Sequence, residues 1–332
     1  MPQNTFDHWD VLADAIRKRK CTPVISNQLM GNLIFGPESR IADSWATREN
    51  YPLAGQRALT RVAQYLSVTR KDAVRAKARY LQFLNEQLIE QASRIPSIAP
   101  ALIAEVRRER MLTFSQIATD RLKIPDFKAQ PDNPLSVLAT LDIPVYLTTS
   151  PHRLIEAALL AYDKQPRTEV YAWREDLEES LPTELLPDLG YKPDVQTPLV
   201  FHLHGIDDDP ASLVLTEDDY LEFLVKITHD LPDTTVMPSA VRNAVSNHWL
   251  LLIGYRMHAW DLHVLLQGMI RGKPKRPRSF TVQLTPEADP AANNAARIQD
   301  YLTNYFDSAQ FDIYWGAADA FAQTLWQETE GG

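Results

Sequence analysis

Residues 144–172 read PVYLTTSPHRLIEAALLAYDKQPRTEVYA, and this stretch decides the fold class. Pro144–Thr148 is a short apolar run typical of a buried strand. Leu154–Tyr162 has the apolar content and length of a helix, and Thr168–Ala172 reads as a second strand. Strand, helix and strand in this order predict two neighbouring parallel strands joined by a helix.

The same alternation extends to both sides of this stretch. Further strands are expected at Thr22–Ser26, Leu199–Leu203, Trp249–Ile253, Ser279–Leu284 and Phe311–Trp315. Helices are expected at Trp9–Arg19, Thr216–Ile227 and Trp260–Ile270. Thr216 is the expected N-cap of the second helix, with Asp219 three residues later. The pattern predicts an α/β fold with a mostly parallel sheet and helices on both faces.

Residues 53–125 have a different character. Their apolar side chains, such as Val62, Leu66, Tyr80 and Leu84, recur at helical spacing among charges. We therefore expect one domain over residues 1–332 with an all-helical insertion at 53–125. The insertion is expected to pack over or beside the crevice at the strand ends. The proline- and acid-rich segment from Leu181 to Pro198 is expected to lie at the surface.

Composition limits the class of protein. The 332 residues are 45% hydrophobic, enough for one large core. No apolar run is long enough to span a bilayer and no secretory signal begins the chain, so a cytoplasmic protein is expected. The net charge of −9 opposes broad binding to nucleic acid. Cys21 is the sole cysteine, which excludes an intrachain disulfide and a multi-thiolate zinc ribbon.

Ligands of parallel α/β sheets bind beyond the carboxyl ends of the strands. The segments to consider are therefore Ser26–Gln28, Thr149–His152, His204–Asp208 and Gly254–Arg256. A glycine at 254 would let the backbone approach a nucleotide closely. The hydroxyls of Thr148–Ser150 either cap the following helix or meet a ligand, and capping is the commoner role.

His202 and His204 lie two apart at the end of a strand, so both face one side of the sheet. They are either core histidines bonded to carbonyls or groups that move a proton. Gly205 and the acidic loop Asp207–Asp209 favour the second role. A metallo-hydrolase of the His-x-His-x-Asp-His type would need an acid at 206 and a histidine at 207. The chain has Ile206 and Asp207, so no metal is expected.

Three segments, taken in order, resemble the sirtuin-like (silent information regulator) domain of bacterial antiphage NAD hydrolases. Tyr146–Glu156 is similar to that family's strand followed by Thr-Thr-Asn-Tyr-Asp. Phe201–Tyr220 resembles its catalytic-histidine segment, with His204 at the catalytic place. Leu251–Asp261 looks like its Gly-Tyr-Ser strand exit. The resemblance covers roughly residues 140–290, and the His204 segment is its most specific part.

The chain departs from the family's pattern at two places. The family's asparagine falls on Ser150, and the aspartate two residues later falls on His152. Its Gly-Ala-Gly turn after the first strand falls on Ser26-Asn27-Gln28, which has no glycine. Serine offers one short hydroxyl where asparagine offers an amide donor and an acceptor. These changes concern catalysis more than a binding fold.

The resemblance implies a Rossmann-like fold and an enzyme that cleaves the nicotinamide–ribose bond of NAD, with antiphage defence by NAD depletion as its role. It implies that His204 is the general base and that Ser150 orients the ribose or the water. The acidic loop at Asp207 would stabilise the positive charge that develops on the ribose. The residues implied to bind NAD are Ser26, Asn27, Gln28, Thr149, Asp207, Gly254, Tyr255 and Arg256.

Two other functions remain open at this point. One is a pseudoenzyme that binds NAD or ADP-ribose as a signal or serves as a structural subunit. The other is a metal hydrolase that uses His202 and His204. A zinc-containing deacetylase is excluded, because zinc-containing sirtuins use four thiolates. The expected partners are NAD or ADP-ribose and further copies of the chain or a regulatory protein, since a freely active NAD hydrolase would be toxic. No membrane or nucleic-acid partner is expected.

Overall fold

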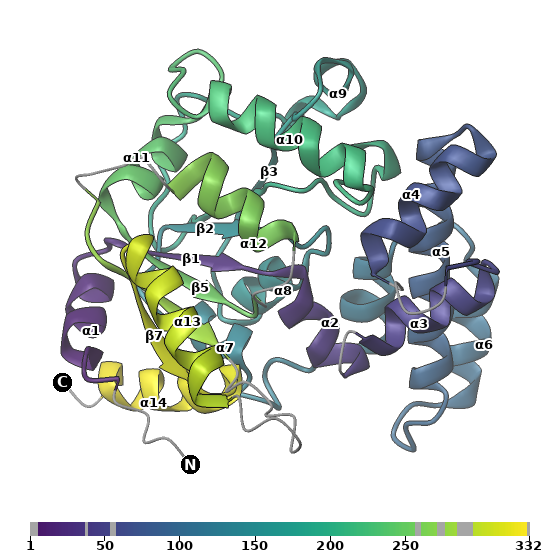
Figure 1. The fold of residues 1–332 in the computed structure, drawn as a ribbon. Coiled ribbons are helices and arrows are strands. Elements are labelled where there is room, and N and C mark those ends of the chain that lie inside the picture. Colours follow the sequence, from purple (N-terminus) through teal and green to yellow (C-terminus); the bar gives the residue numbers. More distant parts are fainter. Residues whose placement is uncertain are drawn as a thin grey trace.

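The computed structural model describes residues 6–36, 39–53, 58–255, 260–270, 276–283 and 295–330. At its centre is a sheet of seven parallel strands in the order β3-β4-β2-β1-β5-β6-β7 (Figure 1). The strands are β1 Cys21–Ile25, β2 Val145–Thr148, β3 Arg167–Val170, β4 Leu199–His202, β5 Trp249–Ile253, β6 Ser279–Gln283 and β7 Phe311–Trp315. Each strand expected from the sequence is present, and the parallel α/β fold is confirmed.

Helices connect and surround these strands. They are α1 Trp9–Arg17, α2 Asn27–Phe35, α3 Ser39–Arg48, α4 Leu59–Arg70, α5 Ala73–Ala92, α6 Pro100–Arg108, α7 Pro134–Thr140, α8 Leu154–Ala161, α9 Glu175–Ser180, α10 Glu217–Asp230, α11 Ser239–Asn247, α12 Trp260–Leu265, α13 Ala295–Ser308 and α14 Ala318–Glu330. Two π-helical segments, Gln116–Leu122 and Leu266–Ile270, follow α6 and α12. The helices between β1 and β2 begin directly after β1, with α2 and α3, and therefore earlier than the expected residue 53.

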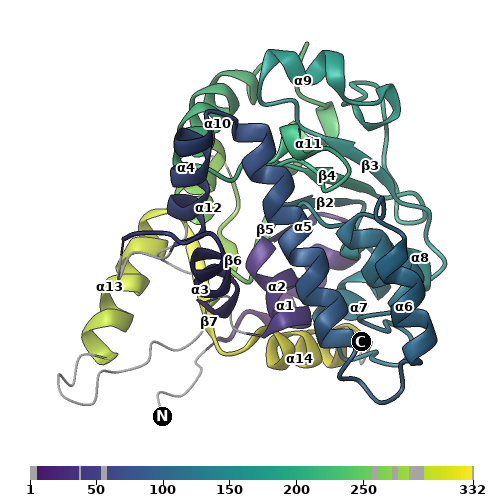
Figure 2. The ribbon, with the colours of Figure 1, turned by 90° about the vertical axis from the view of Figure 1, so that its right-hand side faces the viewer.

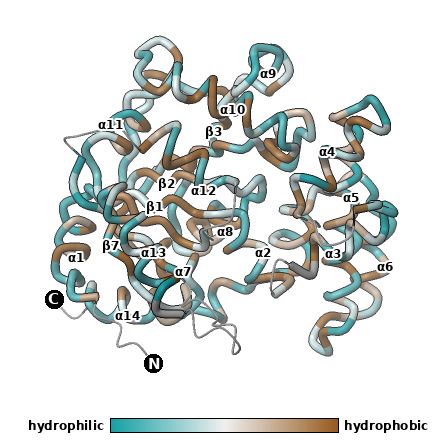
Figure 3. Tube along the Cα trace, viewed as in Figure 1, coloured by the Kyte–Doolittle hydropathy of each residue, from teal (hydrophilic) through white to brown (hydrophobic). Residues whose placement is uncertain are grey.

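Both faces of the sheet are buried. Successive side chains of a strand point to opposite faces, so Val24 and Leu147 pack on one side and Ile25 and Tyr146 on the other. The first side is covered by α10, α11 and α12, and the second by α1, α7 and α14 (Figure 1). Figure 3 shows the strands as a hydrophobic layer inside more hydrophilic helices. Burial on both faces explains why the strands read as continuous apolar runs.

The order of the strands creates a switch point. From β1 the chain first builds outward through β2 to β4 and β3, and then returns to place β5, β6 and β7 on the other side of β1. After β1 the chain therefore proceeds to one side of the sheet, and after the adjacent strand β5 it proceeds to the other side. In folds of this kind, the carboxyl ends of two such strands flank a crevice. The segments after them begin at Ser26 and Gly254.

Helices α3 to α6 lie against the carboxyl-end edge of the sheet (Figures 1 and 2). A buried ion pair fixes them there, because Lys77 Nζ of α5 donates to Asp219 Oδ1 of α10 at 2.9 Å, with side-chain exposures of 0% and 7%. Burial lowers the pKa of the Lys77 ammonium, although Asp219 opposes this shift. Asp219 also accepts the backbone N–H of Thr216, whose side chain caps α10 as expected. The helical segment is thus joined to the covering layer of the sheet.

No helix in the described parts of the chain combines the length and apolar content needed to cross a membrane. The same residues contain no group of three or more His, Cys, Asp or Glu side chains arranged to hold a metal ion.

Candidate functional site

The exits of β1 and β5 touch at the switch point. Ser26 is the N-cap of α2, and its Oγ accepts the N–H of Leu29 at 3.0 Å. Gly254 has φ +84°, and a Cβ on it would lie 2.5 Å from both Ser26 Oγ and Leu29 Cβ. Only glycine fits there, both for its backbone angle and for the close approach. Ser26 is fully buried, so its side chain shapes the turn from within.

Thr149 ties the exit of β2 to this junction. Its Oγ1 accepts the N–H of Asn27 at 3.4 Å and lies 3.1 Å from the hydroxyl of Tyr255. Tyr255 is buried, which raises the pKa of its phenol well above the ordinary value. Thr149 and Tyr255 therefore hold the ends of three strands together at the first turn of α2. Arg256, the next residue named from the sequence, lies outside the described residues.

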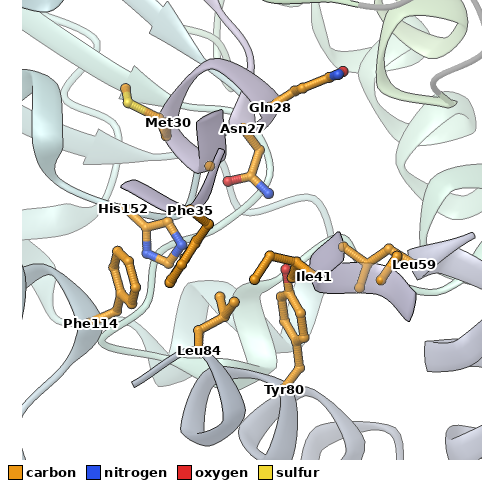
Figure 4. A pocket seen from close by; sticks show the side chains of 12 residues that line it. Asn27, Gln28, Met30, Phe35, Ile41, Leu59, Tyr80, Leu84, Phe114 and His152 are labelled. Carbon is orange, nitrogen blue, oxygen red and sulfur yellow. The ribbon is translucent and has the colours of Figure 1, made fainter. Parts of the chain in front are cut away.

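A pocket opens beside this turn, between α2 and the helices α3, α4 and α5 (Figure 4). Its empty space, counted together with the open solvent at its mouth, is about 490 Å³. The polar side chains on its wall are those of Asn27, Gln28 and His152. Its apolar wall is made by Met30, Phe35, Ile41, Ala42, Leu59, Tyr80, Leu84 and Phe114. Gly31 completes the lining, and a Cβ built on it would meet no atom within 4 Å.

His152 is held on the pocket wall by a buried carboxylate. Its Nδ1 lies 3.1 Å from Asp207 Oδ2, and the two side chains are 5% and 1% exposed. Asp207 Oδ2 also accepts the N–H of Ser115 at 2.9 Å and its hydroxyl at 2.7 Å. Burial raises the pKa of Asp207, but the bonds from His152 and Ser115 outweigh it and leave that pKa below its usual range. The ring of Phe114 packs against the imidazole of His152, with the two ring centroids 4.2 Å apart.

Ser150 joins this histidine to Asn27. Its hydroxyl donates to Asn27 Oδ1 at 3.2 Å and accepts the N–H of His152 at 3.2 Å. The carboxamide of Asn27 points into the pocket (Figure 4). Ser150 does not cap the following helix, because the N-cap of α8 is Arg153, whose N–H is bonded by Ser115 Oγ at 2.8 Å.

A second histidine lies under the same loop. His202 is fully buried, with Nε2 2.7 Å from Glu156 Oε1 and Nδ1 2.8 Å from the carbonyl of Ser150. Thr168 donates its hydroxyl to the same Glu156 oxygen at 3.0 Å. Since both ring nitrogens are bonded within the protein, His202 has none left for a metal ion or a substrate.

His204 lies in an apolar setting instead. It is 3% exposed, and its ring meets the edges of Tyr220 at 5.3 Å and Phe223 at 4.8 Å, both on α10. Its Nε2 has no hydrogen-bond partner. Burial lowers the pKa of the His204 imidazole to about 3, so the ring is neutral at physiological pH. His204 is not one of the residues that form the pocket wall.

A family model described as a SIR2-like domain matches residues 144–306. The chain carries a SIR2-like domain. A comparison with curated proteins finds no match to this chain.

The SIR2-like domain supplies only part of the pocket. From within residues 144–306 come His152, which lines the pocket, and Ser150 and Asp207, which hold polar groups behind the wall. The remaining lining residues come from α2 to α5 and from Phe114, ahead of the matched segment. The pocket is therefore built jointly by the SIR2-like domain and by the helices inserted before it.

The structure brings together several residues named from the sequence and leaves others apart. Asn27 and Gln28 line the pocket, Ser150 and Asp207 support it, and Ser26, Thr149, Gly254 and Tyr255 form the junction behind it. His152 was expected near the site as part of the segment Thr149–His152, but it was not named as a catalytic or binding residue, and it departs from the family motif. Its role could have been inferred from Asp207. The two residues follow β2 and β4, which are neighbouring parallel strands, so the histidine can reach the carboxylate.

Proposed function

We propose that the protein binds NAD in this pocket and hydrolyses its nicotinamide–ribose bond. The supporting observation is the position of the pocket, at the carboxyl-end edge of a SIR2-like sheet and beside the first turn of α2. SIR2-like domains generally bind NAD. In α/β folds a nucleotide's phosphates bind at a helix N-terminus next to the switch point.

The lining fits the parts of this ligand. The half-buried ring of Phe35 offers an aromatic surface to a nicotinamide or adenine ring, and Asn27 offers an amide to a carboxamide or hydroxyl. The N-terminus of α2 lies on the pocket wall, and its dipole and N–H groups can receive the phosphates.

Gly31 provides the sharpest test of where the ligand lies. A Cβ on Gly31 would meet no atom within 4 Å, so Gly31→Leu adds a side chain at the pocket wall from an open position, and it removes a glycine from the interior of a helix. We expect the melting temperature to stay equal or rise, while the Kd for ADP-ribose increases more than about tenfold, or 1.4 kcal/mol. Calorimetric titration measures binding, and chromatography measures nicotinamide release from NAD.

Gly31→Ala is the matched control, since a methyl group leaves most of the space open. It is expected to bind ADP-ribose much as the wild type does. If Gly31→Leu bound ADP-ribose with wild-type affinity, the proposal that NAD binds in this pocket would be wrong.

A binding protein without turnover is the second candidate. The burial of His204 favours it, because the histidine at the family's catalytic place has no access to the pocket. In that case ADP-ribose or NAD would bind and no nicotinamide would be released. Measuring binding and release on the same preparation separates the two functions.

The resemblance to antiphage NAD hydrolases supports a role in defence by NAD depletion. Expression of the chain in bacteria, with cellular NAD measured before and after phage infection, tests this role. A loss of NAD that follows infection and disappears in Gly31→Leu supports it, and NAD levels equal to those of Gly31→Leu contradict it.

A further inference from the structure

We propose that His152, oriented by Asp207, is the group that accepts the proton from the attacking water. This assignment rests on the proposed hydrolysis of NAD and names the residue that performs its proton transfer. It differs from the role that the resemblance gives to His204.

The hydrogen bonds around Asp207 fix which nitrogen of His152 carries the proton. Asp207 is buried, and its lowered pKa keeps it ionised, so its Oδ2 can only accept. Nδ1 of His152 must then be the donor, which leaves Nε2 with a free lone pair in the neutral ring. Two hydrogen bonds from Ser115, one from its backbone N–H and one from its hydroxyl, keep the Asp207 carboxylate in place. A carboxylate that fixes the tautomer of a histidine is the arrangement of a general base.

The place of His152 in the fold agrees with this role. His152 lines the pocket, and its ring lies between Phe114 and Phe35 in view of Asn27 (Figure 4). The side chain of His152 is 5% exposed, whereas Nε2 of His204 is a buried atom without a hydrogen-bond partner. A general base must come within hydrogen-bond reach of the proton that it removes, and the pocket gives His152 this access.

The other histidines near the sheet edge do not meet these conditions. Both nitrogens of His202 are bonded within the protein, and His204 is enclosed by aromatic side chains of α10. Among the described lining residues, His152 is the only histidine, and no carboxylate lines the pocket. Among the lining residues that the structure describes, His152 is therefore the side chain of a type that exchanges protons near neutral pH.

The chemical step balances with water as the second reactant. The oxygen of water forms a bond to C1′ of the ribose while the bond from C1′ to the nicotinamide nitrogen breaks. The electron pair of the broken bond passes to the pyridinium ring, which leaves as neutral nicotinamide. One proton of the water passes to His152 Nε2 and later to solvent. Asp207 stabilises the imidazolium that forms for that moment.

His152→Gln tests the assignment, because glutamine keeps a polar side chain but cannot act as a base. We expect kcat for nicotinamide release to fall about 10²–10⁴-fold, with the Kd for ADP-ribose within about threefold of wild type. His204→Leu tests the rival assignment, because it removes the neutral, buried imidazole at the place where the resemblance puts the general base. Its kcat is expected to stay within about threefold of wild type, provided that its circular dichroism shows a folded protein.

Asp207 acts through His152, so its test needs a second readout. In protein labelled with ¹⁵N-histidine, the ring spectrum of His152 should show the Nδ1–H tautomer, and Asp207→Asn should weaken that preference. Addition of ADP-ribose should shift the His152 ring signals and leave those of His202 in place.

The outcomes are distinct. A wild type that releases no nicotinamide ends the proposed hydrolysis and this assignment together. A wild type that releases nicotinamide, with His152→Gln equally active, overturns the assignment alone. A loss of kcat in His204→Leu with a normal fold would return the role to His204.

Discussion

Two histidine–carboxylate pairs lie at the same edge of the sheet, and they differ in how many ring nitrogens are used. His202 bonds Glu156 with one nitrogen and the Ser150 carbonyl with the other, and its side chain is fully buried. His152 bonds Asp207 with one nitrogen and presents the rest of its ring to the pocket. The two pairs meet at Ser150, which bonds both histidines.

The number of bonded ring nitrogens distinguishes a structural histidine from one that can transfer a proton. A histidine with both nitrogens satisfied holds a loop in position but cannot exchange a proton without breaking a buried bond. A histidine with one nitrogen held and one free is oriented and still available. The first pair therefore sets the position of Ser150, and the second uses that position.

The largest expected effect comes from breaking the enclosed pair. Glu156→Ala leaves His202 buried without its carboxylate, and removal of one partner from a buried pair costs about 3–5 kcal/mol. We expect the free energy of unfolding, measured in urea, to fall by this amount. Glu156→Gln keeps an acceptor and should lose clearly less. A change below about 1 kcal/mol in Glu156→Ala would mean that the pair contributes little to the loop.

The next largest effect is the loss of stability at low pH that His204 causes. The pKa of His204 is about 3 in the folded protein and 6.5 in the unfolded chain, so protons bind the unfolded state first. Its stabilising contribution is complete above pH 6.5 and is lost as the pH falls from 6.5 toward 3. Between pH 7 and pH 5 the wild type should lose about 2 kcal/mol more than His204→Leu.

Urea unfolding of both proteins at the two pH values measures this difference. The difference between the two pH values within one protein cancels the cost of the substitution itself. Subtracting the two differences cancels the contribution of other buried histidines, such as His248, that both proteins contain. Parallel losses in the two proteins would show that His204 is accessible and titrates normally.

The smallest effect sharpens the role of Ser150. Ser150→Ala removes the hydroxyl that holds the Asn27 carboxamide, and one such hydrogen bond contributes about 0.5–1.5 kcal/mol. We expect the Kd for ADP-ribose to rise about two- to tenfold. Asn27→Ala should have a similar effect, and the double variant should lose less than the sum of the two. Full additivity in this cycle would mean that Ser150 and Asn27 act separately.

The strands could be predicted from the sequence because burial on both faces leaves a local pattern. Leu199–Leu203 was expected where β4 spans Leu199–His202, and the other strands agree as closely. α2 was not expected, since its sequence NQLMGNLIF has no charge and a central glycine, and so lacks an amphipathic period. Its one signal was Ser26, a good N-cap residue, for which the resemblance implied a role in binding NAD.

The site was predictable only in part, for a similar reason. Placing candidates at strand ends found Asn27, Ser150 and Asp207, because parallel strands bring their carboxyl ends to one edge. The partnership of His152 with Asp207 spans 55 residues, and Phe114 and Tyr80 reach the pocket only through the packing of the inserted helices. No local pattern contains such distances.

The buried pair of Lys77 and Asp219 has a consequence for synthesis of the chain. The two residues are 142 positions apart, and a ribosome adds about 5–20 residues per second, so roughly 7–30 s separate their appearance. During this interval Lys77 has no buried partner and must stay hydrated, which prevents α5 from taking its final place beside the pocket. A nascent chain therefore cannot complete the pocket until α10 has left the ribosome.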